Sequence, residues 1–169
     1  MTNDIYVYTD GRFAFQNQNY RCAIGRSGII AAADKREGDG ATPIGSYPIR
    51  EIWYRADRVT LPTVNFPVHE IKKTDGWCDA ADHPQYNQHV VLPFTASHEN
   101  LWREDHRYDV VVVLGHNDDP VIPYMGSCIF FHIAEKNYQP TAGCVAVSLE
   151  DMIKILPQLK IETKIHFQQ

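Results

Sequence analysis

The sequence predicts a mainly β fold with one short helix, arranged as a single domain over residues 1–169. Two observations predict this class: short runs rich in β-branched and aromatic residues recur between turn residues, and only one segment has the features of a helix. The chain has 169 residues, of which 44% are hydrophobic and 22% charged, so it is long enough to bury one core.

The N-terminal part of the chain is expected to form a hairpin followed by further strands. Residues 4–15 (DIYVYTDGRFAF) are rich in β-branched and aromatic residues and are interrupted by Asp10-Gly11, a strong hairpin signal. Residues 20–25 (YRCAIG) predict a third strand. Residues 37–54 begin as a turn-rich loop and lead into another strand.

The middle of the chain is expected to be irregular. Residues 56–107 contain four prolines that interrupt every candidate element, and so long a loop region in a compact domain is usually functional. Residues 108–115 (YDVVVVLG) and 127–134 (SCIFFHIA) are apolar runs too short for independent helices. We expect both to be buried central strands.

The single predicted helix covers residues 148–159. Ser148 is expected to be its N-cap, Asp151 completes a capping box, and Pro157 marks its expected end. Residues 161–168 (IETKIHFQ) alternate between apolar and polar side chains and predict a final strand.

Charge and composition limit the partners and the cellular location. The net charge is −5 and the 16 Lys and Arg residues are scattered, so we expect no nucleic-acid partner. No apolar stretch reaches the roughly 18 residues of a membrane span, so we expect no membrane partner. The N-terminal residues lack the features of a signal peptide, and the four cysteines show no CxxC spacing. We therefore expect a cytoplasmic protein with reduced thiols.

A histidine and a cysteine near the C-terminus are candidates for nucleophilic catalysis. His132 ends a predicted buried strand, and Cys144 follows the turn sequence PTAG. Two neighbouring strands joined by a loop of this length can present both side chains at one sheet edge, where an imidazole can activate a thiol. Gly143 allows a close approach of the backbone to a substrate, and amides of this turn can line an oxyanion site.

Two other interpretations of these residues remain open. A cysteine in an apolar strand is most often a small buried hydrophobe, and a single histidine is most often structural. A zinc site could combine His116, Asp118, His132 and Cys144, but their spacing matches none of the recurrent zinc signatures.

The segment GSCIFFHIAEKNYQPTAGCVAV (residues 126–147), preceded by GDGATPIGSYPI (residues 38–49), resembles the catalytic domain of the L,D-transpeptidase family, also called the YkuD domain. The resemblance covers residues 3–156. It implies a β-sandwich fold with one short helix after the cysteine turn. It also implies an enzyme that attacks a carbonyl of a peptidoglycan stem peptide, forms an acyl-thioester, and passes the acyl group to an amine or to water.

Carried onto this sequence, the resemblance makes Cys144 the nucleophile, His132 its general base and Gly143 part of the oxyanion site. It implies no cofactor and no metal, because a thiolate attacks a carbonyl without a Lewis acid. The chain departs from the family pattern at Ala142, where a second histidine is common, and at Ala146, where an arginine is common. Both positions lie where substrate is held.

From this resemblance and the expected cytoplasmic location, we expect an L,D-carboxypeptidase. Such an enzyme would release the terminal D-alanine from a tetrapeptide muropeptide during cell-wall recycling. One alternative is an L,D-transpeptidase that forms 3-3 cross-links or exchanges D-amino acids. An alternative of another class is a catalytically lapsed, peptide-binding relative, in which Cys144 only packs.

An anionic stem peptide requires polar and basic side chains near the cysteine. We favour Arg26 over Lys35 and Arg36, although each could be a solvated surface charge. Residues 116–118 are expected to emerge at the same sheet end as His132, although Asn-Asp-Asp-Pro is also ordinary turn chemistry. Residues 76–87 could form a rim, with Trp77 and Tyr86 as contact surface. The substrate-binding candidates are Arg26, His116, Asn117, Asp118, Ser127 and Thr141.

Overall fold

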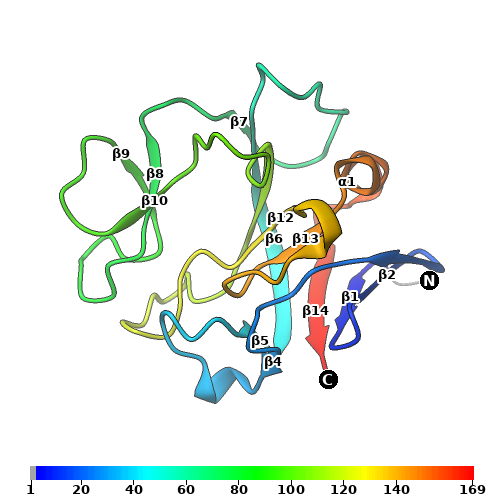
Figure 1. Cartoon of the computed structure of the whole chain (residues 1–169), viewed down its shortest axis with the longest axis horizontal. Helices are drawn as coiled ribbons and strands as arrows, with labels where there is room; N and C mark the ends of the chain where they lie inside the picture. Colours follow the sequence, from blue (N-terminus) through cyan, green and yellow to red (C-terminus); the bar gives the residue numbers. More distant parts are fainter. Residues whose placement is uncertain (1–2) are drawn as a thin grey trace.

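The computed structural model describes residues 3–169 and is mainly β, as predicted (Figure 1). Its strands are β1 (Ile5–Tyr8), β2 (Arg12–Phe15), β3 (Gln18–Arg21), β4 (Ile29–Ile30), β5 (Thr42–Pro43), β6 (Gly45–Tyr54), β7 (Val68–Glu70), β8 (Asp75–Cys78), β9 (His89–Val91), β10 (His98–Asn100), β11 (Val110–Leu114), β12 (Phe130–Ile133), β13 (Val145–Val147) and β14 (Lys164–Gln168). Its helices are α1 (Leu149–Ile155) and the 3₁₀ turns η1 (Ala32–Asp34), η2 (Lys136–Tyr138) and η3 (Leu156–Gln158).

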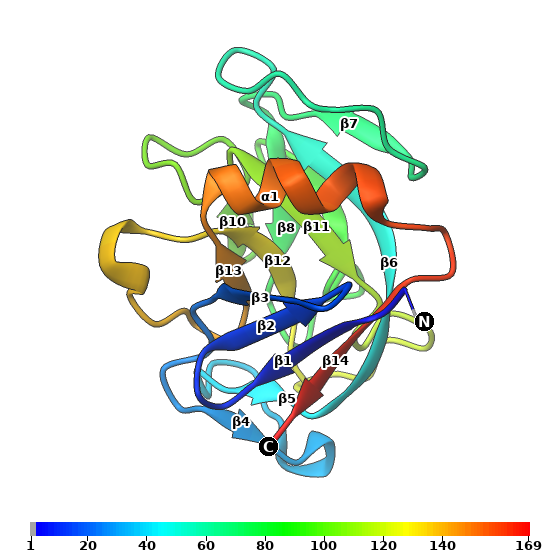
Figure 2. The same ribbon diagram turned by 90° about the vertical axis from the view of Figure 1, so that its right-hand side faces the viewer.

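Most strands belong to one sheet that curls into two layers. The strand order is β13-β12-β11-β6-β14-β1-β2-β3, and β7 pairs with β6 beside this path. In Figure 2, β1, β2, β3 and β14 lie in front of β11 and β12. The two ends of the sheet meet where Ala23, just after β3, exchanges backbone hydrogen bonds of 2.8 and 2.9 Å with Ala146 of β13. The predicted β-sandwich is therefore confirmed.

The central strands are buried on both faces, which explains their continuous apolar sequences. Val110 and Val112 of β11 belong to an inner core between the two layers, to which α1 also contributes. Val111 and Val113 belong to an outer cluster on the opposite face, together with Phe130 of β12. The expectation of buried central strands is confirmed, and the cavity described below lies on the outer face.

The prediction that residues 56–107 are irregular was wrong in part. This segment contains β7 and a small sheet of order β10-β8-β9, visible in green on the left of Figure 1. Each of these strands has only three or four residues, too few for an alternating pattern to stand out. The small sheet contributes Trp77 to the outer cluster, so it covers the outer face of β11 and β12.

The third strand begins and ends earlier than the sequence predicts. Gln16 and Asn17 adopt positive φ angles of 48° and 63° and form a tight turn, so β3 begins at Gln18 and pairs with β2. Beyond Arg21 the chain makes only isolated bridges. These bridges run beside the segment that carries the cysteine turn.

The predicted start of the helix at Ser148 is confirmed. The side chain of Ser148 accepts a hydrogen bond of 3.1 Å from the amide of Asp151, as an N-cap should. Met152 and Ile155 pack into the inner core, and Pro157 lies in the 3₁₀ turn that follows the helix. None of the helices within residues 3–169 is both long and apolar enough to span a bilayer.

Candidate active site

Two threonine hydroxyls hold the turn before Cys144. Thr141 Oγ1 donates to the carbonyl of Cys144 (2.6 Å) and accepts from the amide of Gly143 (3.1 Å). Thr42 Oγ1 donates to the carbonyl of Gly143 (2.7 Å). Gly143 has a φ of +139°, and a Cβ at this position would lie 2.9 Å from the carbonyl oxygen of Ala41, so the turn requires glycine. The backbone that presents Cys144 is thus fixed from both sides.

The thiol of Cys144 is neutral in the resting protein. Its S–H donates to the carbonyl of Cys128 (3.0 Å), and Sγ accepts from the amide of Phe130 (3.4 Å). Burial, with a smaller contribution from the Glu99 carboxylate, raises the pKa of Cys144 to about 12, although the Phe130 amide acts in the opposite direction. Attack on a carbonyl therefore requires a base that removes the thiol proton during the reaction.

His132 is suited to be that base. Its Nδ1 lies 2.9 Å from the carbonyl oxygen of Ile133, and because a carbonyl only accepts, Nδ1 carries the proton and donates. In the neutral ring, Nε2 then holds the lone pair. Burial lowers the pKa of His132 to about 4, so the imidazole is neutral near pH 7 and able to accept a proton.

His132 and Cys144 lie on the same face of neighbouring strands. His132 pairs with Ala146 in the parallel register of β12 and β13, so Cys144 lies two residues before its cross-strand partner. Both side chains line one cavity of about 260 Å³, together with Ala142 and Ala146. Within residues 3–169, no direct hydrogen bond joins the two side chains.

Charged side chains of both signs line the cavity. Their ion pairs differ, and this difference shows which of them is free to bind an anion. Lys35 is buried and pairs with Asp39, its Nζ lying 2.5 Å from Oδ1. The charged lining residues are Arg26, Lys35, Arg103, Arg107, Glu37, Asp79, Glu99 and Glu135.

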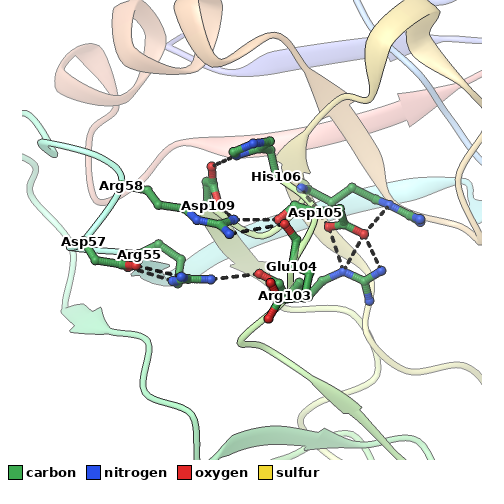
Figure 3. A network of polar contacts seen from close by, with 9 residues as sticks. Arg55, Asp57, Arg58, Arg103, Glu104, Asp105, His106 and Asp109 are labelled. Carbon is green, nitrogen blue, oxygen red and sulfur yellow. Dashed lines mark hydrogen bonds and ion pairs between the residues drawn. The ribbon is translucent and has the colours of Figure 1, made fainter.

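Arg103 and Arg107 are both held by carboxylates. Figure 3 shows Arg103 and Asp105 within a network of polar contacts. Arg103 lies 2.6 Å from Asp105, a pairing that lowers the pKa of this carboxyl to about 2. Arg107 lies 3.3 Å from Asp105 and 2.8 Å from Glu135. Arg58 donates to the carbonyl of Asp105 (2.8 Å) and so anchors the backbone of this segment. The two arginines are therefore already neutralised by acidic partners.

Arg26 differs from the other three cations of the cavity. Within residues 3–169, its guanidinium makes no ion pair, while its backbone amide donates to the carbonyl of Thr141 (2.8 Å). A Cβ at Gly40 would lie 2.6 Å from Arg26 Cζ, so this glycine leaves room for the guanidinium. Arg26 is thus an unpaired cation held beside the cysteine turn. Arg36 does not line the cavity.

The expectation that residues 116–118 emerge at the same sheet end as His132 was wrong. Strands β11 and β12 are antiparallel, with Val111 opposite His132, so the chain leaves β11 beside the beginning of β12. His116 is buried against Tyr47, and burial lowers its pKa to about 4. None of these three residues is among those that line the cavity of Cys144.

Asn117 and Asp118 have other partners. The Asn117 side chain closes its own loop, because it donates to the carbonyls of Ile122 (3.0 Å) and Gly126 (2.9 Å). Asp118 pairs with Arg50 (2.8 Å) and lines a separate cavity of about 300 Å³. The ligand set considered for zinc is therefore not assembled, since His116 and Asp118 lie apart from the cavity of the thiol.

Ser127 and Thr141 do line the cavity, and their role in substrate binding stays a prediction. Ser127 Oγ donates to Glu37 (2.8 Å). By contrast, Trp77 and Tyr86 are 7% and 2% exposed, so the expectation that they form a contact rim was wrong. Trp77 packs edge-on against Phe130 and belongs to the outer cluster.

Sequence reasoning missed the lining residues that come from the irregular segment. These are Asp79, Glu99, Arg103 and Arg107, and it also missed Tyr108, the first residue of the next predicted strand. One signal could have found the last three. The charged run REDHRYD (residues 103–109) leads into the predicted strand at residues 108–115 and includes its first two residues. Antiparallel pairing places the start of this strand beside the end of the strand that carries His132.

The comparisons with known proteins agree with this geometry. The model of the L,D-transpeptidase catalytic domain family, YkuD, matches residues 2–166, which include His132, Gly143 and Cys144. Neither the curated proteins nor the solved structures contain a match to this chain. The family consists of cysteine-dependent acyltransferases and peptidases that act on peptidoglycan peptides. The chain therefore belongs to the L,D-transpeptidase catalytic domain family.

Proposed function

We propose that this protein is an L,D-carboxypeptidase that releases the terminal D-alanine from a peptidoglycan-derived tetrapeptide. The observation that carries the proposal is the unpaired guanidinium of Arg26 in the same cavity as Cys144. A substrate cleaved at its last peptide bond presents a free carboxylate next to that bond. A guanidinium without an acidic partner is suited to bind it through two parallel hydrogen bonds.

The size of the cavity also supports hydrolysis. Its volume of about 260 Å³ lies below the roughly 300–1,000 Å³ of pockets that enclose drug-sized ligands. It accommodates the end of one peptide, and water is a smaller second reactant than an amine on a second peptide strand. We therefore assign water as the preferred acceptor of the acyl group.

In the first half of the reaction, Cys144 Sγ attacks the carbonyl carbon before the D-alanine, and the thiol proton moves to Nε2 of His132. A carbon–sulfur bond forms, and the carbon–nitrogen bond to D-alanine breaks. The proton then passes from His132 to the leaving amine. The Phe130 amide, 3.4 Å from Sγ, favours negative charge on the sulfur during this step.

In the second half, water attacks the acyl-thioester, and His132 accepts a proton from the water. The carbon–sulfur bond breaks, and the proton held by His132 returns to Cys144. The carboxylic acid formed on the third residue of the peptide loses its proton to solvent and becomes a carboxylate. We also propose that the protein is intracellular and acts there on soluble muropeptides. The four free, buried cysteines support it, because reduced thiols are typical of reducing compartments.

The reaction is tested by supplying two substrates separately: a soluble disaccharide tetrapeptide, with and without an added D-amino acid, and purified sacculi. We expect free D-alanine and a tripeptide from the soluble substrate, little D-amino acid exchange, and no reaction with sacculi. Chromatography with mass spectrometry measures all three. New 3-3 cross-links in sacculi with the soluble peptide intact would show a transpeptidase instead. Binding without any turnover would show a lapsed, peptide-binding relative.

Arg26→Gln is expected to raise KM by roughly tenfold or more, because a hydrogen bond to a charged group contributes about 1.5–3 kcal/mol. Arg26→Lys should recover part of this loss, since it retains the charge without the planar fork. Arg21→Gln is the matched control, because Arg21 is an exposed arginine that lies over Tyr138 and does not line the cavity. Steady-state kinetics with the tetrapeptide measure the effect. Equal KM values for Arg26→Gln and Arg21→Gln would show that Arg26 does not bind the substrate.

A further inference from the structure

Tyr108 connects a buried carboxylate to the candidate base. Its ring packs edge-on against His132, with 5.3 Å between ring centroids and 75° between ring planes. Its hydroxyl donates to the carboxylate of Glu99, which comes from β10 of the small sheet. Tyr108 is 6% exposed, and all three residues line the cavity of Cys144.

His132 has few other supports for its ring. One hydrogen bond, from Nδ1 to the carbonyl of Ile133, fixes one edge. Its cross-strand partners are Ala146 of β13 and Val111 of β11, which offer only small aliphatic side chains. Within residues 3–169, Tyr108 makes the only aromatic contact with this ring, and its edge contact limits how the imidazole can turn.

Tyr108 is itself held firmly. A second edge contact joins its ring to Phe130, at 5.9 Å between centroids, and the guanidinium of Arg103 lies 5.3 Å from the ring centroid. The carboxylate of Glu99 makes no ion pair within residues 3–169, and the Tyr108 hydroxyl is its side-chain donor. The hydroxyl is thus fixed at its far end by a carboxylate that no other side chain competes for.

We propose that Tyr108 is a positioning residue for His132, and that its bond to Glu99 holds the tyrosine ring so that the imidazole keeps its orientation toward Cys144. This inference rests on the proposed function. The charge of Glu99 also acts on the thiol of Cys144, but Glu99→Leu and Glu99→Gln remove this charge alike. Within residues 3–169, the Tyr108–Glu99 pair makes no hydrogen bond to Cys144 Sγ. It acts through the histidine, and so through the rate of the proton transfer.

The test compares tyrosines in two equivalent contacts. Tyr108→Phe keeps the ring but loses the bond to Glu99, and it is expected to lower kcat by roughly tenfold while KM changes less than about twofold. The matched control is Tyr47→Phe. Tyr47 packs against buried His116 in nearly the same geometry, 5.3 Å and 78°, and its hydroxyl donates to a backbone carbonyl outside the cavity. We expect the control to keep the kcat of the unaltered protein.

A second pair of variants separates positioning from loss of stability. Glu99→Leu and Glu99→Gln both remove the charge, but only glutamine retains an acceptor for the Tyr108 hydroxyl. We expect kcat of Glu99→Leu to fall as in Tyr108→Phe, and kcat of Glu99→Gln to recover most of the loss. Thermal melts identify any variant that fails to fold. If a variant of one pair does not fold, the kcat values of the other pair test the inference.

Equal kcat values for Tyr108→Phe and Tyr47→Phe, or for Glu99→Leu and Glu99→Gln, would overturn the inference. So would a loss confined to KM. These outcomes differ from a failure of the proposed function. In that case Cys144→Ser or His132→Ala would retain turnover, or the tetrapeptide would not be hydrolysed at all.

Discussion

Cys144→Ser is expected to lose nearly all turnover, by roughly a thousandfold or more, and to keep its fold. Serine is close in size to cysteine, so its hydroxyl can still donate to the carbonyl of Cys128 and accept from the amide of Phe130. A hydroxyl is a much weaker nucleophile than a thiol from which a base withdraws the proton. Release of D-alanine measures turnover, and a thermal melt checks the fold.

Cys22→Ser is the control for this variant, because Cys22 is also a buried free thiol but lies in the inner core. We expect it to lose stability without losing kcat. Intact-protein mass spectrometry during turnover should show an acyl adduct on the unaltered protein and none on Cys144→Ser. Similar kcat values for Cys144→Ser and the unaltered protein would exclude the thioester mechanism.

His132→Ala is expected to lower kcat by roughly a hundredfold or more, the usual scale of a positioned general base. The pH dependence gives a second readout. Because burial lowers the pKa of His132 to about 4, kcat/KM of the unaltered protein should fall as the pH decreases through about 4, where the imidazole gains a proton and can no longer accept one. The alanine variant should lack this acid limb.

His116→Gln is the matched control for this prediction. Burial also lowers the pKa of His116 to about 4, but this histidine lies outside the cavity. We expect the glutamine variant to retain both its rate and the acid limb. If His116→Gln lost the acid limb and His132→Ala kept it, the general base would be His116 and not His132.

Local sequence predicted the first hairpin, the central strands and the helix, and it singled out the two central residues of the candidate site. The Asp10-Gly11 hairpin, the buried strands β11 and β12 and the cap at Ser148 follow from residue types and short spacings. His132 and Cys144 could be paired because one loop separates their two neighbouring strands. These features depend on residues close together in the chain.

The remaining cavity lining depends on how distant segments pair, which short sequence patterns do not encode. Asp79 directly follows β8 and Glu99 lies in β10, and these two strands of the small sheet have only four and three residues. His116 was misplaced because the sequence does not show that the chain leaves β11 at the end opposite His132. Arg26 and Lys35 both line the cavity, as expected of basic side chains near Cys144, and the role of Arg26 in substrate binding stays a prediction. That Arg26 has no acidic partner within residues 3–169 is visible only in three dimensions.

The bridge between Ala23 and Ala146 sets the order in which the site can assemble. It joins segments near opposite ends of the chain, so its formation costs more chain entropy than local hairpins such as β1–β2 and comes after them. Cys144 lies two residues before this bridge, and its turn reaches its final backbone only when the sheet closes. During synthesis, β1 and β2 emerge well before β12 and β13, so the first hairpin can form before the strands that carry the imidazole and the thiol are complete.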